Sequence, residues 1–477
     1  MAITRDGLPP MASGAIGATI VATLVAAALS PSGHIVLACG AALCIIILLL
    51  WRQSEPPILL LPALFQWSEV SIWAYATAWR GTPLSLQSSY GADLDTSTIY
   101  GLLGVVCLSL GMRLAMGRAK GGVSFAERLR QEAFRRTFDQ VALVAAMAML
   151  AGYFLSGVGR LAGGAGQIFF AFGQVKCIGI FALTYWCLVR GQKYPILLAV
   201  VALDIGVGLT GFFAQFKDVI LTVLVAALAA RPRIRPSDAI MVGIAAALIL
   251  SLATFWTAVK PGYRQLLNQG SGAQEVTVPV NERVSYLWNR AMTFDGTDLT
   301  EGFDGLVNRH GYTEFLGLVM AYVPETVPHE NGQLTLNVLM HIAIPRAVWA
   351  DKPALPHDTD VMAQYTGLPN AWDSSTSISI GHLGDLYIDF GWIGALFAMM
   401  AIGGLIGTFY RKLRDYRDGS ALVAAGLCIM IVLPIAYFGT AYIKLVGAFI
   451  MTTISAFLTQ RQILPRLKAL IPGIRPA

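Results

Sequence analysis

Charged side chains are scarce in this chain. Asp, Glu, Lys and Arg together make up 13% of its 477 residues, whereas 56% are hydrophobic. The mean hydropathy is +0.62, and soluble globular domains carry about 25% charged residues. This composition excludes a soluble globular protein and predicts a membrane protein with many spans. The net charge of +6 is explained by basic residues in short loops between apolar runs, so we expect no nucleic-acid partner.

Cysteine is also rare, and metal-binding patterns are nearly absent. The six cysteines all lie inside apolar runs without paired spacing, which excludes a disulfide framework and a thiolate metal site. The histidines lack the H-E-x-x-H pattern of zinc proteases. Asp93 and Asp95 have a D-x-D spacing that can hold a divalent ion, but two acids in a loop are common. We therefore expect no metal site and no cofactor.

Long hydrophobic runs are what the chain has in abundance. A helix needs about 17 to 25 apolar residues to cross a bilayer. Runs of about that length occur near 11–29, 34–51, 57–79, 97–117, 139–156, 167–188, 194–210, 214–230, 239–258, 389–409, 420–437 and 439–459. The predicted fold class is all-α, a polytopic bundle of about twelve transmembrane helices.

The basic residues predict the orientation of the bundle. Arg and Lys cluster after even-numbered runs, near 113–136, 190–193, 231–235, 411–417 and 461–468. Under the positive-inside rule both termini are then cytoplasmic. The first run resembles a signal peptide in ending with AAALSPSG, but it is longer than usual, so we expect an uncleaved span.

One long polar segment, 259–380, interrupts the apolar runs. It is acidic overall, and three stretches in it, 284–294, 313–325 and 334–345, carry apolar residues at helical spacing but are too short or too polar to span. We predict a large, partly helical periplasmic loop. The domains expected are transmembrane helices 1–9 in 1–258, this loop in 259–380, and transmembrane helices 10–12 with a cytoplasmic tail in 381–477.

Charged and titratable side chains that could be functional are concentrated between residues 344 and 394. Arg346 and Lys352 flank Trp349 in a proline-containing loop. His382 and Asp385 then share a helical face at the mouth of a span, together with Asp389. An ionised group at that depth must meet water, a partner or a ligand. These acids could simply pair with loop arginines, or Asp385 or His382 could serve as general base.

Anionic groups are commonly held by Arg and Lys. Each basic residue of the loop could bind an anion or could instead pair with a nearby carboxylate. The candidates for anion binding are Arg264, Arg283, Arg290, Arg309, Arg346 and Lys352. Inside the apolar runs lie Glu69, Lys176 and Lys217. Intramembrane charges are functional candidates, although Glu69 could be neutral and Lys217 could snorkel to the interface.

Two motifs carry a resemblance to a known family. The first is P-R-x-x-W-x-x-K-P at residues 345–353, and the second is G-x-x-G-D-x-Y-x-x-F-G-x-x-G at 381–394, which includes Tyr387. With the many spans and the late outer loop, they resemble the Wzy-type O-antigen and exopolysaccharide repeat-unit polymerases, a GT-C-like class. Residues 210–229 are similar to a family stretch in which an arginine is common at the position of Lys217.

The resemblance implies an enzyme of the bacterial inner membrane. It would polymerise undecaprenyl-pyrophosphate-linked oligosaccharide repeat units at the periplasmic face, among membrane lipids and with a chain-length regulator (co-polymerase) as a candidate partner. It implies Asp385 and His382 as catalytic residues. The residues implied for binding pyrophosphate or glycan are Arg346, Lys352, Arg290, Arg309, Lys217, Arg264, Trp349 and Tyr387.

Three other functions remain open at this point. A flippase or transporter for a lipid-linked saccharide would use the intramembrane charges, but such proteins commonly have repeated halves and we find no repeat. An O-antigen ligase would share the donor. A metal-dependent glycosyltransferase would depend on Asp93.

Overall fold

The computed structural model describes residues 7–118, 122–162, 166–209, 216–231, 236–271, 276–344, 356–369, 378–416 and 419–466. All regular secondary structure in these residues is helical, and no strand occurs among them. The all-α prediction is therefore confirmed for the described part of the chain.

The N-terminal half forms eleven α-helices. They are α1 (Pro10–Leu29), α2 (Gly33–Leu50), α3 (Leu60–Arg80), α4 (Leu94–Met116), α5 (Phe125–Arg135), α6 (Phe138–Leu161), α7 (Gly166–Gly173), α8 (Lys176–Arg190), α9 (Tyr194–Leu209), α10 (Phe216–Ala230) and α11 (Pro236–Leu267), with a 3-10 turn η1 (Leu84–Leu86). Side-chain caps start several of these helices. Asp93, for example, accepts the N–H of Thr96 at the start of α4.

Among its described residues, the C-terminal half adds five short helices, then one long helix and two shorter ones. They are α12 (Val280–Met292), α13 (Gly296–His310), α14 (Glu314–Tyr322), α15 (Gln333–Ala343), α16 (Asp358–Thr366), α17 (His382–Arg414), α18 (Ala421–Val432) with η3 (Leu433–Ile435), and α19 (Tyr442–Leu458) with the π-turn η4 (Thr459–Ile463). The segment predicted as a partly helical loop thus contains α12 to α16. Helix α11 also continues beyond residue 258, where its predicted span ends.

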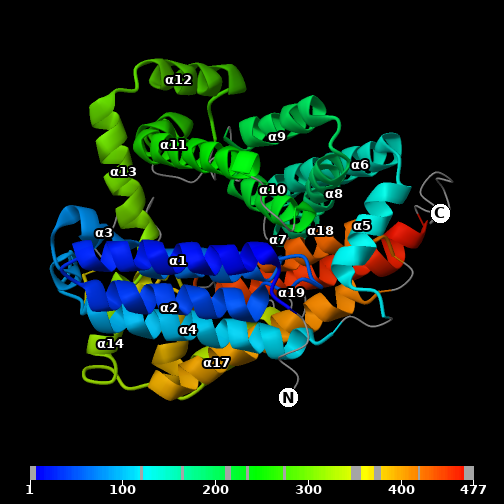
Figure 1. Ribbon diagram of the computed structural model, residues 1–477. Helices are drawn as coiled ribbons and strands as arrows, with labels where there is room; N and C mark the ends of the chain where they lie inside the picture. The colour runs from blue at the N-terminus through cyan, green and yellow to red at the C-terminus, as the bar shows by residue number, and fades with distance from the viewer. Residues whose placement is uncertain are drawn as a thin grey trace.

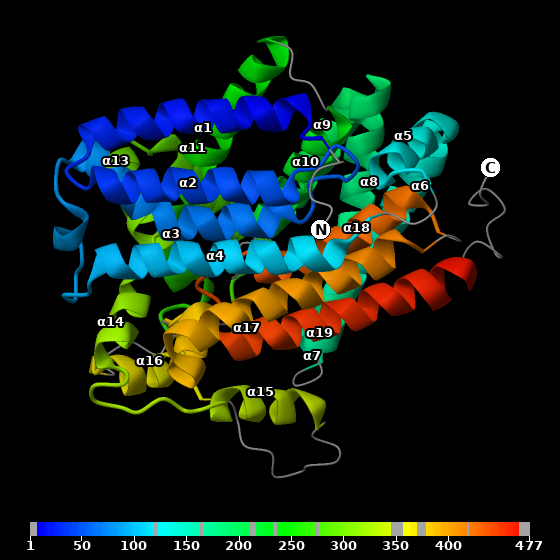
Figure 2. The ribbon, with the colours of Figure 1, turned by 60° about the horizontal axis from the view of Figure 1, so that its bottom comes forward.

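The long helices lie side by side along one direction. Helices α1, α2, α4 and α17 run nearly parallel in Figure 1, with α13 and α14 at one end and α5 at the opposite end. Helices α14, α15 and α16 group on one side of the bundle (Figure 2). The molecule therefore has two distinct ends, called here the α13 end and the α5 end.

Seven helical stretches among the described residues are long and apolar enough to cross a membrane. They are Pro10–Leu29, Gly33–Leu50, Leu94–Met116, Phe138–Leu161, Gly166–Arg190, His382–Arg414 and Tyr442–Arg466. Two shorter apolar helices, Tyr194–Leu209 and Ala421–Ile435, accompany them. The chain thus has the apolar helices of a multi-pass membrane protein.

Helices α4 and α17 approach each other closely because glycines face the contact. A Cβ on Gly111 would lie 2.0 Å from the carbonyl oxygen of Met400, and one on Gly403 would lie 2.0 Å from that of Leu108. Only glycine permits such an approach. Helix α17 is also interrupted at Gly391, where φ is +67°. Its first turns, which carry His382, are therefore set at their own angle.

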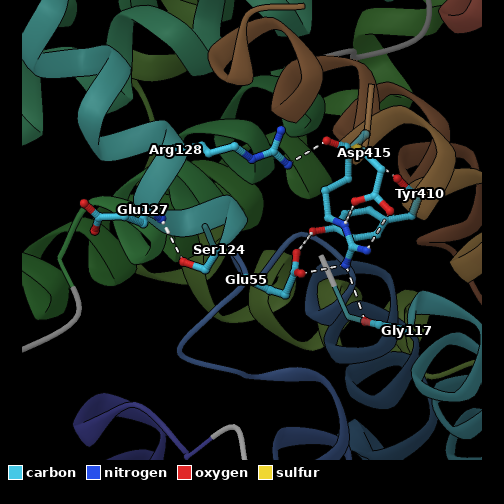
Figure 3. A network of polar contacts seen from close by, with 9 residues as sticks. Glu55, Gly117, Ser124, Glu127, Arg128, Tyr410 and Asp415 are labelled. Atoms are coloured by element: carbon cyan, nitrogen blue, oxygen red, sulfur yellow. Dashed lines mark hydrogen bonds and ion pairs between the residues drawn. The ribbon is translucent and has the colours of Figure 1, made fainter. Parts of the chain in front are cut away.

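A buried ionic network holds the α5 end together (Figure 3). The guanidinium of Arg414 donates to Glu55 at 2.6 Å and to Asp415 at 2.8 Å, and Tyr410 donates to the other oxygen of Glu55 at 2.8 Å. Arg128 of α5 donates to the Arg414 carbonyl at 2.7 Å. This network fastens α17 to α5 and to the segment between α2 and α3.

Candidate functional site

The C-terminus of α13 is fixed against α3. The indole N–H of Trp73 donates to the carbonyl of Val307 at 3.1 Å. A Cβ on Gly311 would lie 2.3 Å from that same indole nitrogen. Helix α13 also packs along α11. The last turn of α13, with Arg309 and His310, is therefore held between α3 and α11.

Four basic side chains from three helices gather at this place. Lys217 begins α10, Lys260 and Arg264 lie one turn apart on α11, and Arg309 is in the last turn of α13. Arg309, Arg264 and Lys217 all act electrostatically on Lys260. We call Lys217, Lys260, Arg264 and Arg309 the basic cluster.

Burial lowers pKa values in the basic cluster, and for Lys260 and Arg264 the neighbouring cations lower them further. Burial, together with the charges of Arg309, Arg264 and Lys217, lowers the pKa of Lys260 to about 7. Burial also lowers the pKa of Arg309. Burial and the Arg309 charge lower that of Arg264. The side chains of Lys217 and Arg309 nevertheless remain exposed. Such a concentration of positive charge favours an anion, which would relieve the repulsion.

His310 lies at the edge of the basic cluster, next to Lys217, and is hydrogen-bonded to Ser68. The Ser68 hydroxyl donates to the Phe65 carbonyl at 2.7 Å, and its oxygen lies 2.7 Å from His310 Nε2. In the tautomer with its proton on Nε2, the ring donates to the Ser68 oxygen and Nδ1 is a proton acceptor. Burial and the Lys217 charge lower the pKa of His310 to about 4, so the ring is neutral at pH 7.

Glu69 connects the basic cluster to the turn before α19. Its carboxylate accepts the backbone N–H of Phe438 and, at 3.3 Å, that of Gly439. The neighbouring residue Tyr437 places its ring 5.6 Å from Lys217 Nζ. Glu69 also contributes to the electrostatic field at Lys217. Glu69 thus lies beside the cations, as does Asp218, the residue after Lys217, and Glu69 also orders the backbone next to them.

The two predicted catalytic residues begin α17 behind this turn. His382 is 1% exposed, its ring is 5.6 Å from that of Phe438, and neither ring nitrogen has a well-formed hydrogen bond. Asp385 accepts the N–H of Tyr442, the first residue of α19, at 2.7 Å. Asp389 accepts three N–H groups at the start of α15. Both acids therefore cap helices.

The remaining predicted binding residues are distributed elsewhere. Arg290 pairs with Asp298 at 3.0 Å between α12 and α13. Tyr387 is buried and donates to the Val323 carbonyl at 3.1 Å. Arg346, Trp349 and Lys352 lie outside the described residues. Of the predicted set, the structure brings together Lys217, Arg264 and Arg309.

The intramembrane lysine Lys176 belongs to a different group. Its Nζ lies 3.5 Å from Asp204, which also accepts the hydroxyl of Tyr153. Both members of the ion pair are buried. This pair joins α8 to α9 and is neutralised within the bundle.

Two site residues were not selected from the sequence, Lys260 and His310. Lys260 and Arg264 follow an apolar run with an i, i+4 spacing, which places them on one helical face. This spacing is a sequence feature that identifies Lys260 as a candidate site residue. No sequence feature identifies His310, because its position depends on how α13 packs against α3. No group of three His, Cys, Asp or Glu able to hold a metal ion occurs in the part of the chain that the structure describes.

Comparison with known proteins gives one match. A family model described as "Domain of unknown function (DUF8712)" matches residues 100–466. No curated protein and no solved structure matches the chain. The matched range includes the basic cluster and His310, whereas Glu69 and Ser68 precede it.

Proposed function

This chain belongs to the DUF8712 family, and we propose that it is a membrane-embedded polysaccharide polymerase whose donor is an undecaprenyl-pyrophosphate-linked oligosaccharide. The observation that carries the proposal is the convergence of Lys217, Lys260, Arg264 and Arg309 from three helices. The motifs at 345–353 and 381–394 support the same class of enzyme through their resemblance to Wzy-type polymerases.

The chemistry of such a cluster suits a pyrophosphate leaving group. Glycosyl transfer breaks the bond between the anomeric carbon and the phosphate oxygen, so negative charge develops on the pyrophosphate. Arginine forks bind phosphate oxygens in pairs and stay charged at any working pH. Cations fixed before the reaction stabilise that charge without reorganising. Arg264 and Arg309 would bind the pyrophosphate, with Lys217 and Lys260 beside them.

The acceptor hydroxyl also needs a group that takes its proton. His382 and Asp385 were implied for this role, but His382 is buried and Asp385 caps α19. His310 is neutral at pH 7, carries an acceptor Nδ1 and lies next to the cations. We therefore assign the general base to His310 within this proposal.

Within this proposal the chain crosses the membrane twelve times. The seven candidate spans, the two shorter apolar helices and α3, α10 and α11 would form the twelve spans expected from the sequence. The basic residues of α5 and of the end of α17 would face the cytoplasm. The α13 end, with the basic cluster, would then face the periplasm, and both termini would be cytoplasmic in the inner membrane.

A glycan profile tests the function. Cells lacking the gene are complemented with wild type, Arg309→Ala or Arg290→Ala; Arg290 is the control because it is ion-paired outside the cluster. We expect a polymer ladder from wild type and Arg290→Ala, and single lipid-linked repeats accumulating outside with Arg309→Ala. Repeats accumulating inside would instead indicate a flippase, and long undecaprenyl-linked chains a ligase. Either result would overturn the proposal.

A further inference from the structure

A concave feature lies at the α5 end, far along the bundle from the basic cluster. It is a groove of about 190 Å³, formed by α6, α7, α8, α18 and η4. Its lining is almost wholly apolar and includes Val144, Ala148, Phe172, Ile178 and Leu422. Exposed Ala151 and Ile463 lie on its rim, so the groove opens sideways from the helix bundle. A groove of this kind on a membrane-spanning surface faces acyl chains.

The groove is long enough to cross one leaflet. Its lining follows α6 from Gln140 to Leu155. At a rise of 1.5 Å per residue this is roughly 22 Å along the helix. Half of a hydrocarbon core is about 15 Å thick. The groove can therefore accommodate a single acyl chain that enters from the α5 end.

An unpaired polar group points to an occupant. Thr459 lines the groove, is 5% exposed, and its hydroxyl has no hydrogen-bond partner. It begins the π-turn η4, and π-turns inside helices frequently occur at functional sites. A buried hydroxyl without a partner is costly unless a ligand or water meets it. An ester oxygen of a lipid is a suitable acceptor for it.

The mouth of the groove is positively charged. Glu132 and Arg136 lie there, 3.6 Å apart. The Glu132 carboxylate also accepts the N–H groups of Ala421 and Leu422 at the start of α18. It therefore caps α18 in addition to pairing with Arg136. Further basic residues lie near Arg136 in the chain or against its neighbours: Arg135 precedes it, Arg130 and Arg190 lie over the ring of Phe134, and Lys193, three residues after α8 ends, lies over the ring of Phe138. This charge complements an anionic headgroup.

We propose that this groove binds one acyl chain of an anionic phospholipid, with the lipid phosphate beside Arg136 and an ester oxygen accepting from Thr459. The inference is independent of the proposed polymerase activity, since the groove and the basic cluster lie at opposite ends of the bundle.

Native mass spectrometry of the full-length protein tests this. The protein is purified in detergent and titrated with phosphatidylglycerol or phosphatidylcholine. We expect one retained phosphatidylglycerol per chain, with phosphatidylcholine bound at least roughly tenfold more weakly. Ala148→Trp fills the groove and should weaken phosphatidylglycerol binding by about tenfold or more. Leu150→Trp on the same helix is the matched control, because Leu150 is 69% exposed and does not line the groove.

Thr459→Val provides a second variant in case Ala148→Trp does not fold. It keeps the shape of the side chain and removes the hydroxyl, so it should also weaken retention of phosphatidylglycerol. The proposal is overturned if the two groove variants retain the lipid as well as Leu150→Trp does. It is equally overturned if phosphatidylcholine binds as tightly as phosphatidylglycerol, or if the groove variants change a dimer mass and not lipid retention.

Discussion

The carboxylate of Glu69 on α3 accepts the backbone N–H of Phe438, a residue 369 positions later in the chain. The same oxygen accepts the N–H of Gly439 at 3.3 Å. Next to this turn, the ring of Tyr437 lies beneath Lys217, and His382 packs against Phe438. One buried acid thus orders the turn whose Tyr437 ring lies against Lys217.

Replacing Glu69 should therefore destabilise the protein. Glu69→Ala would leave two backbone N–H groups without their acceptor, at a cost of about 1–3 kcal/mol for a buried unsatisfied donor. Glu69→Gln keeps one acceptor oxygen and should cost less. Thermal unfolding of the purified variants in detergent measures both. Equal unfolding temperatures for wild type and Glu69→Ala would show that the Phe438 contact contributes little.

His310→Gln tests the role of His310 as general base while keeping its hydrogen bond to Ser68. The glutamine amide can still donate to Ser68, but it cannot take up a proton. We expect transfer to slow by about 10²- to 10⁴-fold, while the unfolding temperature stays near that of wild type. Turnover of a lipid-linked repeat by purified protein gives the rate. Wild-type turnover by a folded His310→Gln protein would exclude His310 as the base.

Lys260 should make anion binding depend on pH near neutrality. Its lowered pKa of about 7 means that the side chain is charged below this pH and increasingly neutral above it. Pyrophosphate affinity should therefore fall about tenfold as pH rises from 6 to 9. Lys260→Arg stays charged and should remove this dependence. Pyrophosphate titrations at several pH values check the prediction, and a flat wild-type profile would contradict it.

The ionic network at the α5 end allows a stability prediction. Arg414 is fully buried and pairs with Glu55 at 2.6 Å. Arg414→Ala would leave the Glu55 carboxylate buried without its cation, and breaking such a pair costs about 3–5 kcal/mol. Lys412→Ala, at an exposed position two residues earlier, should change little. Unfolding temperatures compare the two, and similar values would contradict the importance of the Arg414 network.

Much of the fold follows from local properties of the sequence. Apolar runs of spanning length predict long helices because the bilayer leaves the backbone few alternatives. Short amphipathic stretches such as 284–294 and 334–345 likewise have helices close to where they were predicted. The sequence does not single out helix α13, because Gly296–His310 is polar overall, although Leu299, Phe303 and Val307 recur in it at helical spacing. Its position depends on tertiary contacts such as that between Trp73 and Val307.

The site was only partly predictable for the same reason. Lys217 in an apolar run and the arginines Arg264 and Arg309 are visible as charges, but a sequence does not tell which of several cations converge. Arg290 looks like Arg309 in sequence, yet it pairs with Asp298. Asp385 and Asp389 share a helical face as expected, and that face caps α19 and α15. Convergence and capping are properties of packing between distant segments.

The central claim is that the basic cluster binds pyrophosphate, and a calorimetric titration of the purified full-length protein with inorganic pyrophosphate tests it most directly. We predict that wild type and Arg290→Ala bind with the same affinity, and that Arg309→Ala binds at least about tenfold more weakly, the loss expected for one charge-assisted contact. Undiminished binding by a folded Arg309→Ala protein would contradict the account.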